Sequence, residues 1–203
     1  MPCIRLNNQV TLQSGSSVQA LSDITGSIIC CDAAWKMELN KQPTQAGIGV
    51  YIKLENNQHC EHIYIAALSP PTISPLQVEA FAFTFATKIT DGLRLQQPQF
   101  FTDCKVLATA LACEDILAAP FPWTMRPFLA EIQASSSFVV NRVHHFNRSF
   151  NIKAHHQARL AMKFKNRNCL ALCINTGVDI CPARAISTVI DVNPFTVISV
   201  LCA

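Results

Sequence analysis

Three short apolar runs follow one another closely in the first third of the chain, at residues 27–36, 46–53 and 60–67. Each run is rich in β-branched and aromatic side chains, which favour strands. The segments between them contain asparagine and proline, which are typical of turns. Parallel strands need a crossover connection of about a dozen residues or more, and these connections are shorter. The runs therefore predict an antiparallel meander of three strands.

A well-marked helix should follow the meander. Ser74 suits the N-cap, Pro75 suits the first helical position, and Gln77 supplies the partner of a capping box. The helical pattern continues to Asp91, and Gly92 is a stop signal. This change from strand to helix excludes an all-β fold.

Residues 99–163 alternate between strand and helix patterns. Strands are expected at residues 99–102 and 138–144, and helices at residues 104–113, 123–135 and 151–163. The predicted fold class is mixed α/β, with a five-stranded sheet of three antiparallel strands and two more, flanked by helices.

The two ends of the chain differ from this middle part. Residues 1–26 are rich in Gln, Asn and Ser and are interpreted as a flexible leader. Residues 164–203 are apolar, contain four of the ten cysteines and are interrupted by Pro182 and Pro194. We interpret this segment as a poorly ordered or loosely docked tail. The domain itself is expected to span residues 27–163.

Composition narrows the cellular setting. The N-terminus lacks a secretory signal pattern, so the ten cysteines are expected to remain reduced thiols. The absence of a C-x-x-C pair argues against structural zinc. No uncharged apolar run reaches the roughly 18 residues of a membrane span. We expect an intracellular protein, nuclear or cytoplasmic, not secreted and without a membrane partner. A net charge of +3 favours a polyanionic partner only weakly.

Three carboxylates occupy unusual positions. Asp32 lies inside an apolar run, Glu79 lies near the start of a helix rich in Phe and Ala, and Asp103 ends a buried strand. Alone, Asp103 would suit an N-cap and Glu79 a helix dipole. Buried charges are unfavourable unless they are paired or bound to metal. Two Mg²⁺ ions bridged by such carboxylates hydrolyse phosphodiesters, so the three together favour a metal centre and a nucleic-acid substrate.

Five stretches, in order, resemble the ribonuclease H type-1 superfamily, and specifically its plant reverse-transcriptase-like branch, which derives from retroelements. They are residues 31–36, 46–51, 77–82, 101–107 and 148–155. The resemblance implies the fold predicted above.

The same resemblance implies a catalytic and metal-binding centre of Asp32, Glu79 and Asp103 that uses Mg²⁺ or Mn²⁺. The implied activity is endonucleolytic hydrolysis of the RNA strand in RNA–DNA hybrids. Selectivity for RNA would then come from shape and 2′-hydroxyl contacts.

Two residues depart from the family pattern. His155 stands where many members carry a fourth acid. Histidine is a poorer Mg²⁺ ligand than a carboxylate, so His155 either weakens one metal site or transfers protons as a catalytic group. Ala33 replaces the glycine that usually follows the first Asp. A long basic substrate-gripping insertion is missing, which lowers the expected affinity.

Several residues beside the motifs are candidate contacts for nucleic acid. Lysine and arginine there could bind phosphates, whereas the resemblance implies that Asn151 and Arg148 fix the turn before the last helix. The candidates are Ala33, Lys36, Lys105, Arg148 and Asn151, with Lys153 as a further phosphate contact.

Other notable side chains are assigned plainer roles. Trp123 and Phe128 are interpreted as core residues. His59 and His62 point to opposite faces of a strand, so a metal site there would need a bulge.

Three functions remain open. The first is a Mg²⁺-dependent ribonuclease acting on RNA–DNA hybrids, as a monomer. The second is a catalytically weak or inactive domain that binds RNA–DNA hybrid or RNA and derives from a retroelement; His155 and the missing insertion favour it. The third is a protein-interaction module that docks through the apolar segment 164–203.

Overall fold

The computed structural model describes residues 25–36, 42–55, 61–113, 115, 121–164, 170–173, 181–188 and 190–203. The predicted leader, residues 1–26, therefore lies outside the described part except for its last two residues. His59, one of the two histidines considered above as a metal site, also lies outside it.

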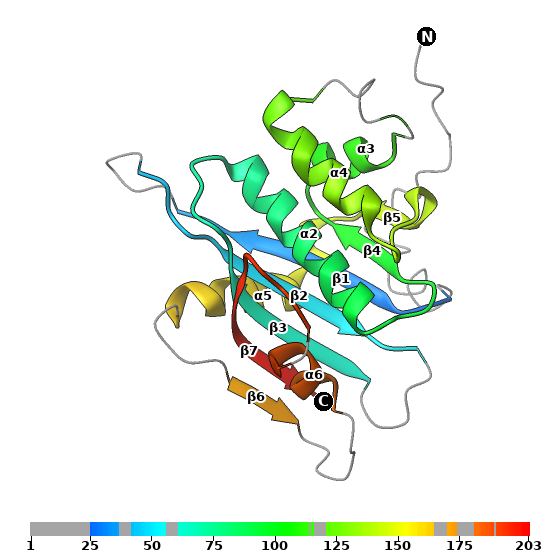
Figure 1. Ribbon diagram of the computed structural model, residues 1–203, viewed down its shortest axis with the longest axis vertical. Helices are drawn as coiled ribbons and strands as arrows, with labels where there is room; N and C mark the ends of the chain where they lie inside the picture. Colours follow the sequence, from blue (N-terminus) through cyan, green and yellow to red (C-terminus); the bar gives the residue numbers. More distant parts are fainter. Residues whose placement is uncertain are drawn as a thin grey trace.

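One mixed sheet organises the described chain (Figure 1). Its seven strands are arranged in the order β5-β4-β1-β2-β3-β7-β6. The first three strands form the predicted antiparallel meander, and β4 pairs with β1 in parallel. The strands are β1 (Ile28–Ala34), β2 (Gly47–Lys53), β3 (His62–Leu68), β4 (Gln99–Thr102), β5 (Val143–His145), β6 (Leu170–Cys173) and β7 (Thr196–Cys202).

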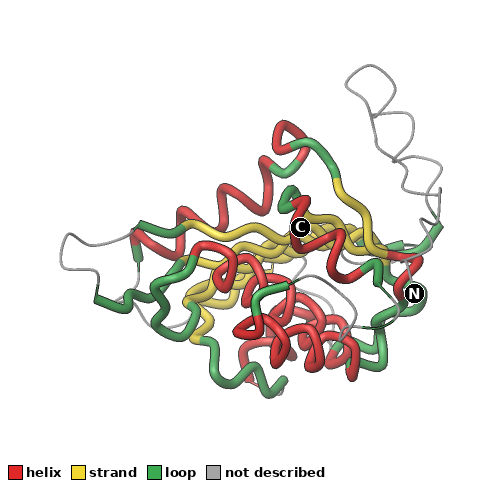
Figure 2. Tube along the Cα trace, turned by 90° about the horizontal axis from the view of Figure 1, so that it is seen from above, coloured by secondary structure: helices red, strands yellow, loops and turns green. Residues whose placement is uncertain are grey.

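Helices cover both faces of the sheet, which Figure 2 shows edge-on. On one face, α2 packs against β1 and β2, and α4 packs against α2. On the other face, α5 crosses β1, β2 and β3. The helices are α2 (Pro75–Gly92), α3 (Lys105–Leu111), α4 (Arg126–Ala134), α5 (Ile152–Lys163) and α6 (Pro182–Thr188), with short 3₁₀ turns η1 (Trp123–Met125), η2 (Val140–Arg142) and η3 (Arg148–Phe150).

The α2 side holds the larger part of the core. Phe83 and Phe85 of α2 and Phe100 of β4 are fully buried there. Helix α2 begins at the predicted N-cap, where the Ser74 side chain accepts a hydrogen bond from the Gln77 N–H. The return bond expected in a capping box is not among the described contacts: Gln77 Oε1 accepts from the Thr72 hydroxyl, and the Ser74 N–H donates to Thr72 Oγ1.

Two glycines allow α5 to lie directly on the sheet. A Cβ atom on Gly49 would collide with the Ala154 carbonyl oxygen, and one on Gly47 would collide with the Ala158 carbonyl oxygen. Glycine at both positions of β2 therefore permits backbone contact between strand and helix. This contact fixes the start of α5 beside β1.

The predicted strand at residues 138–144 is wrong over most of its length. The structure has a strand only from Val143 to His145, preceded by the 3₁₀ turn η2. Trp123 is likewise not a core residue, since it is 77% exposed in η1. Phe128 does join the core, in an edge-to-face contact with Phe81.

The apolar segment after residue 163 enters the sheet, in contrast to the predicted loosely docked tail. Strand β7 pairs antiparallel with β3 and β6 pairs in parallel with β7, which raises the strand count from five to seven. Val200 and Cys202 are buried in the main core. Ile198, Val200 and Cys202 of β7 are thus buried, whereas Val197 and Leu201 are only partly buried, so docking of a partner through this segment stays a prediction.

Candidate active site

The topology brings the carboxylates of Asp32, Glu79 and Asp103 to the edge of the sheet at which β1 and β4 end, which we call the acidic edge. β1 and β4 run in parallel, so their carboxyl ends lie together. Asp32 lies near the end of β1, and Asp103 follows β4 directly. Glu79 enters from the second turn of α2. One carboxylate oxygen from each of Asp32, Glu79 and Asp103 lies within 4.8 Å of the others.

Burial makes this arrangement electrostatically strained without a cation. Burial, the charge of Asp32 and the charge of Asp103 together raise the pKa of Glu79 to about 8. Burial and then the charge of Asp103 also raise the pKa of Asp32, against the opposing effect of His155. Three like-charged groups this close favour either a bound proton or a bound cation.

The donor set fits a hard divalent cation. Mg²⁺ and Mn²⁺ are bound by carboxylate oxygens, with water and phosphate oxygens completing the shell. Asp32, Glu79 and Asp103 offer such oxygens from three different elements of the fold. A metal ion needs several ligands that lie close together. Among the described residues, these three carboxylates form such a group.

His155 joins this cluster from the first turns of α5. Its Nδ1 lies 2.6 Å from Oδ2 of Asp32, while its side chain is 30% exposed and that of Asp32 only 2%. When Asp32 is ionised its carboxylate only accepts hydrogen bonds, and Nδ1 then carries the hydrogen. In that tautomer the other ring nitrogen, Nε2, has a lone pair that can accept a hydrogen bond.

Asn151 and Arg148 tie the start of α5 to the acidic edge. The fully buried Asn151 side chain donates through Nδ2 to the Cys31 carbonyl at 2.9 Å and to Asp103 Oδ1 at 3.5 Å. Arg148 Nε lies 3.9 Å from Asp103 Oδ2, with 70% of its side chain exposed. Asn151 therefore acts as a structural bridge, and Arg148 places an accessible positive charge beside the site.

The remaining predicted contacts lie around this centre. Ala33 follows Asp32 in β1 and is partly buried. Lys36 and Lys105 are exposed. Among the described contacts, none joins either lysine to the three carboxylates, so a role in binding substrate stays a prediction for both.

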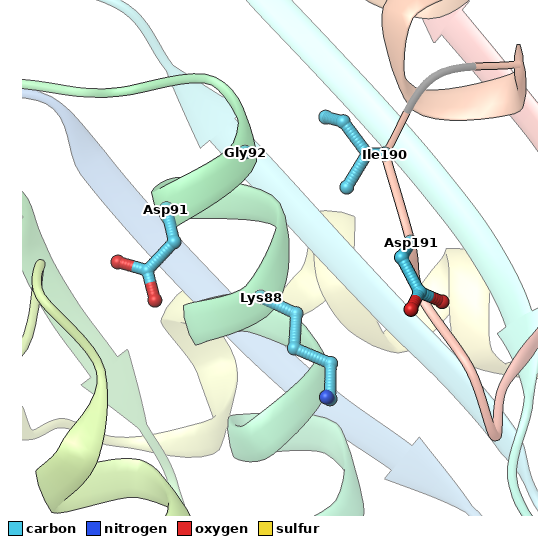
Figure 3. A pocket seen from close by; sticks show the side chains of 5 residues that line it. All are labelled: Lys88, Asp91, Gly92, Ile190 and Asp191. Carbon is cyan, nitrogen blue, oxygen red and sulfur yellow. The ribbon is translucent and has the colours of Figure 1, made fainter.

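A pocket of about 430 Å³ lies away from the acidic edge, at the far end of α2 (Figure 3). Its polar groups already have partners: Lys88 forms a 3.0 Å ion pair with Glu131, and Asp91 accepts from the Ser136 hydroxyl and the Ser137 N–H. The pocket is thus unrelated to the acidic centre.

Solved structures share this architecture, which is a ribonuclease H-like α/β fold. The RNase H1 called LC11, in complex with RNA/DNA hybrid, matches with a TM-score of 0.52 and 20% identity over 68% of this chain and 96% of that chain. RNase H1 from the halophilic archaeon Halobacterium salinarum NRC-1 matches with a TM-score of 0.53 and 13% identity over 68% and 97%.

A third structure, the N-terminal RNase H domain of a Mycobacterium tuberculosis protein, was solved as a fusion with maltose-binding protein. It matches with a TM-score of 0.53 and 16% identity over 68% of this chain and 93% of that chain. The predicted fold class is confirmed. No protein-family model and no curated protein matches the sequence.

The sequence alone named Lys153 and His62 separately but did not predict that they lie together with two tyrosines near α5. The Lys153 ammonium nitrogen lies 3.0 Å from the Tyr51 hydroxyl, and Tyr51 lies beside Tyr64 and His62. The available signal was period-two placement: Tyr51 and Lys53, and His62 and Tyr64, each share a strand face.

Among the described residues, no helix is long and apolar enough to span a membrane.

Proposed function

We propose that the protein is a metal-dependent endonuclease that hydrolyses the RNA strand of RNA–DNA hybrids. The observation that carries this proposal is the convergence of Asp32, Glu79 and Asp103 within 4.8 Å at the carboxyl edge of a ribonuclease H-like sheet. The fold likeness to an RNase H1 in complex with RNA/DNA hybrid supports the choice of substrate.

Each side chain has a defined task in this proposal. Asp32, Glu79 and Asp103 would hold the ions, Mg²⁺ or Mn²⁺. When bound, two such ions activate a water molecule and stabilise the leaving oxygen. His155 keeps Asp32 oriented through Nδ1 and offers Nε2 for proton transfer. Arg148, whose side chain is 70% exposed, would neutralise a substrate phosphate.

A second candidate is supported by one specific contact. The His155 ring contacts Oδ2 of Asp32, one of the two oxygens that this carboxylate could offer to a metal ion. A chain whose first carboxylate is held this way would bind metal weakly. It would then act as a nucleic-acid-binding domain with little or no cleavage, in keeping with the proposed origin from a plant-type retroelement.

A cleavage assay separates the two candidates. A labelled RNA–DNA hybrid is incubated with the wild-type protein in Mg²⁺ and, separately, in Mn²⁺. The Asp32→Asn, Glu79→Gln double variant tests the acidic centre, and Glu55→Gln is the matched control, because Glu55 is an exposed acid after β2. We expect cleavage by the wild type and the control and none by the double variant.

Absence of wild-type cleavage in both metals, from a folded sample, would overturn the enzyme proposal. Hybrid binding that weakens as salt rises would then support the second candidate. The proposed activity also implies a compartment that contains RNA–DNA hybrids, nuclear or cytoplasmic, and it requires only a monomer.

A further inference from the structure

An aromatic and basic cluster lies on the α5 face of the sheet. Tyr51 of β2 and Tyr64 of β3 are cross-strand partners with ring centroids 5.3 Å apart. His62 Nδ1 lies 3.0 Å from the Tyr51 hydroxyl. Lys153 Nζ lies 3.0 Å from that hydroxyl, 4.2 Å from the Tyr51 ring centroid and 5.8 Å from the Tyr64 ring centroid. We name these four residues the tyrosine cluster.

The tyrosine cluster is accessible, unlike the phenylalanines of the core. Lys153 is exposed and Tyr64 is partly exposed, while 28% of the His62 side chain is exposed. Tyr51 is buried at 8% exposure beneath the lysine. A partner would therefore meet the Lys153 ammonium and the Tyr64 ring first.

The charge around the cluster favours an anionic partner. Helix α5 carries no acidic residue, and its basic side chains are Lys153, His155, His156, Arg159 and Lys163. Lys53 adds a positive charge, directly across from His62 in the β2–β3 pairing. One acid borders the cluster: Glu61 Oε2 lies 3.9 Å from His62 Nε2.

The cluster is adjacent to the acidic centre but distinct from it. Tyr51 pairs with Cys30, and Asp32 pairs with Gly49, two residues further along each strand. Two residues of strand correspond to roughly 7 Å. Lys153 and His155, both at the start of α5, point to the two different groups.

We propose that the tyrosine cluster binds a single-stranded segment of nucleic acid, with a phosphate on Lys153 and a base against the Tyr64 ring. Aromatic side chains on neighbouring strands of a sheet are a known means of stacking unpaired bases. Paired bases in a duplex do not expose their faces, which selects a single strand. This binding requires no cleavage and so does not depend on the activity proposed above.

The test measures binding of a fluorescein-labelled twelve-nucleotide oligouridylate to the full chain by fluorescence anisotropy. Excess EDTA is present, so that cleavage cannot contribute. The variants are Tyr64→Leu, which removes the ring, and Lys153→Gln, which removes the charge. Lys163→Gln is the matched control, because it removes an exposed charge from the other end of the same helix.

We expect Tyr64→Leu to weaken binding about tenfold, as is usual for loss of one stacked base. Lys153→Gln should weaken binding and reduce the salt dependence by about one phosphate contact. Tyr64→Phe and Lys153→Arg, which keep ring and charge, should bind like the wild type. Glu61→Gln should bind more tightly, since it removes the bordering negative charge.

Two outcomes would overturn the proposal. One is a wild-type protein that does not bind the oligouridylate. The other is equal weakening by Lys153→Gln and Lys163→Gln together with wild-type affinity in Tyr64→Leu, which would indicate general attraction to charge. If circular dichroism shows that Tyr64→Leu does not fold, the affinities of Lys153→Gln and Lys163→Gln are compared instead. Equal weakening in these two variants then overturns the proposal. Because metal is absent throughout, failure of the cleavage assay leaves this result unaffected.

Discussion

His155 Nδ1 and Asp32 Oδ2 lie 2.6 Å apart although 123 positions separate the two residues in the sequence. The contact joins the start of α5 to the end of β1, inside a group of three carboxylates. The imidazole therefore opposes the rise that burial causes in the pKa of Asp32. The first prediction follows from this contact, and the second follows from the burial of Glu79 beside it.

Replacing His155 with aspartate should strengthen metal binding. The His155→Asp variant frees Oδ2 of Asp32 and adds a fourth carboxylate, which is a better Mg²⁺ ligand than imidazole. Isothermal titration with Mg²⁺ should show a lower dissociation constant, by about tenfold or more, a change equivalent to 1.4 kcal/mol. His155→Gln, which frees the oxygen without adding charge, is the control. An unchanged affinity in His155→Asp would show that the side chain at position 155 does not influence metal binding.

Stability without divalent metal should fall as pH rises from about 5 to above 8. The pKa of Glu79 is raised from 4.5 to about 8, mainly by burial. Between these values the folded state holds a proton that the unfolded state has released, so folding loses stability as pH increases. Thermal unfolding in EDTA should show a midpoint several degrees lower at pH 8.5 than at pH 5.5.

Two controls accompany this pH experiment. Glu79→Gln removes the titrating group, so its midpoint should change much less over the same pH range. Mg²⁺ at pH 8.5 should restore part of the wild-type midpoint, because binding to the folded state alone stabilises it. A wild-type midpoint that rises with pH in EDTA would contradict the assignment.

The glycine contact beneath α5 should be intolerant of even one methyl group. In Gly49→Ala the new Cβ would meet the Ala154 carbonyl oxygen, which belongs to the helix backbone. Overpacking of this kind destabilises by about 1–3 kcal/mol, sometimes more. Urea unfolding measures the change, with the exposed Lys53→Ala on the same strand as control, expected within about 0.5 kcal/mol. Equal stabilities would mean that α5 does not contact β2 closely.

The segment before β7 should contribute strongly to stability. Phe195 is 7% exposed and its ring lies 5.1 Å from that of Phe85 and 6.0 Å from that of Phe81, measured between centroids. Phe195→Ala should destabilise by about 3–5 kcal/mol. Leu172→Ala, on the half-exposed Leu172 of β6, should change stability by less than about 0.5 kcal/mol. Similar small effects in both variants would restore the interpretation of a loosely docked tail.

The sequence predicts those helices and strands that are marked by local features, such as a cap, a turn residue or a periodic apolar pattern. The meander, α2 and α5 agree with their turn residues, caps and periodicity. The apolar surroundings of Asp32, Glu79 and Asp103 in the sequence also predict that the three carboxylates lie together, and the structure brings them together. Their role as metal ligands stays a proposal.

Long-range pairing explains what the sequence alone missed. Thr196–Cys202 is rich in β-branched residues, but its partners are the distant strand β3 and the neighbouring strand β6, and neither pairing is visible in the local pattern. Strand β5 is short because η2 immediately precedes it. The Tyr51–Lys153 contact joins residues 102 positions apart, a separation that periodicity within one element does not reveal.

The pairing of β3 with β7 also orders the events of synthesis. Residue Ile63 faces Cys202, and the main-chain groups of His62 and Ala203 bond to each other. While the nascent chain is shorter than this, β3 remains an unpaired edge with free backbone donors and acceptors, a state prone to association with other chains. A chain that ends before residue 196 would lack the strand that covers this edge, and it would expose an aggregation-prone surface.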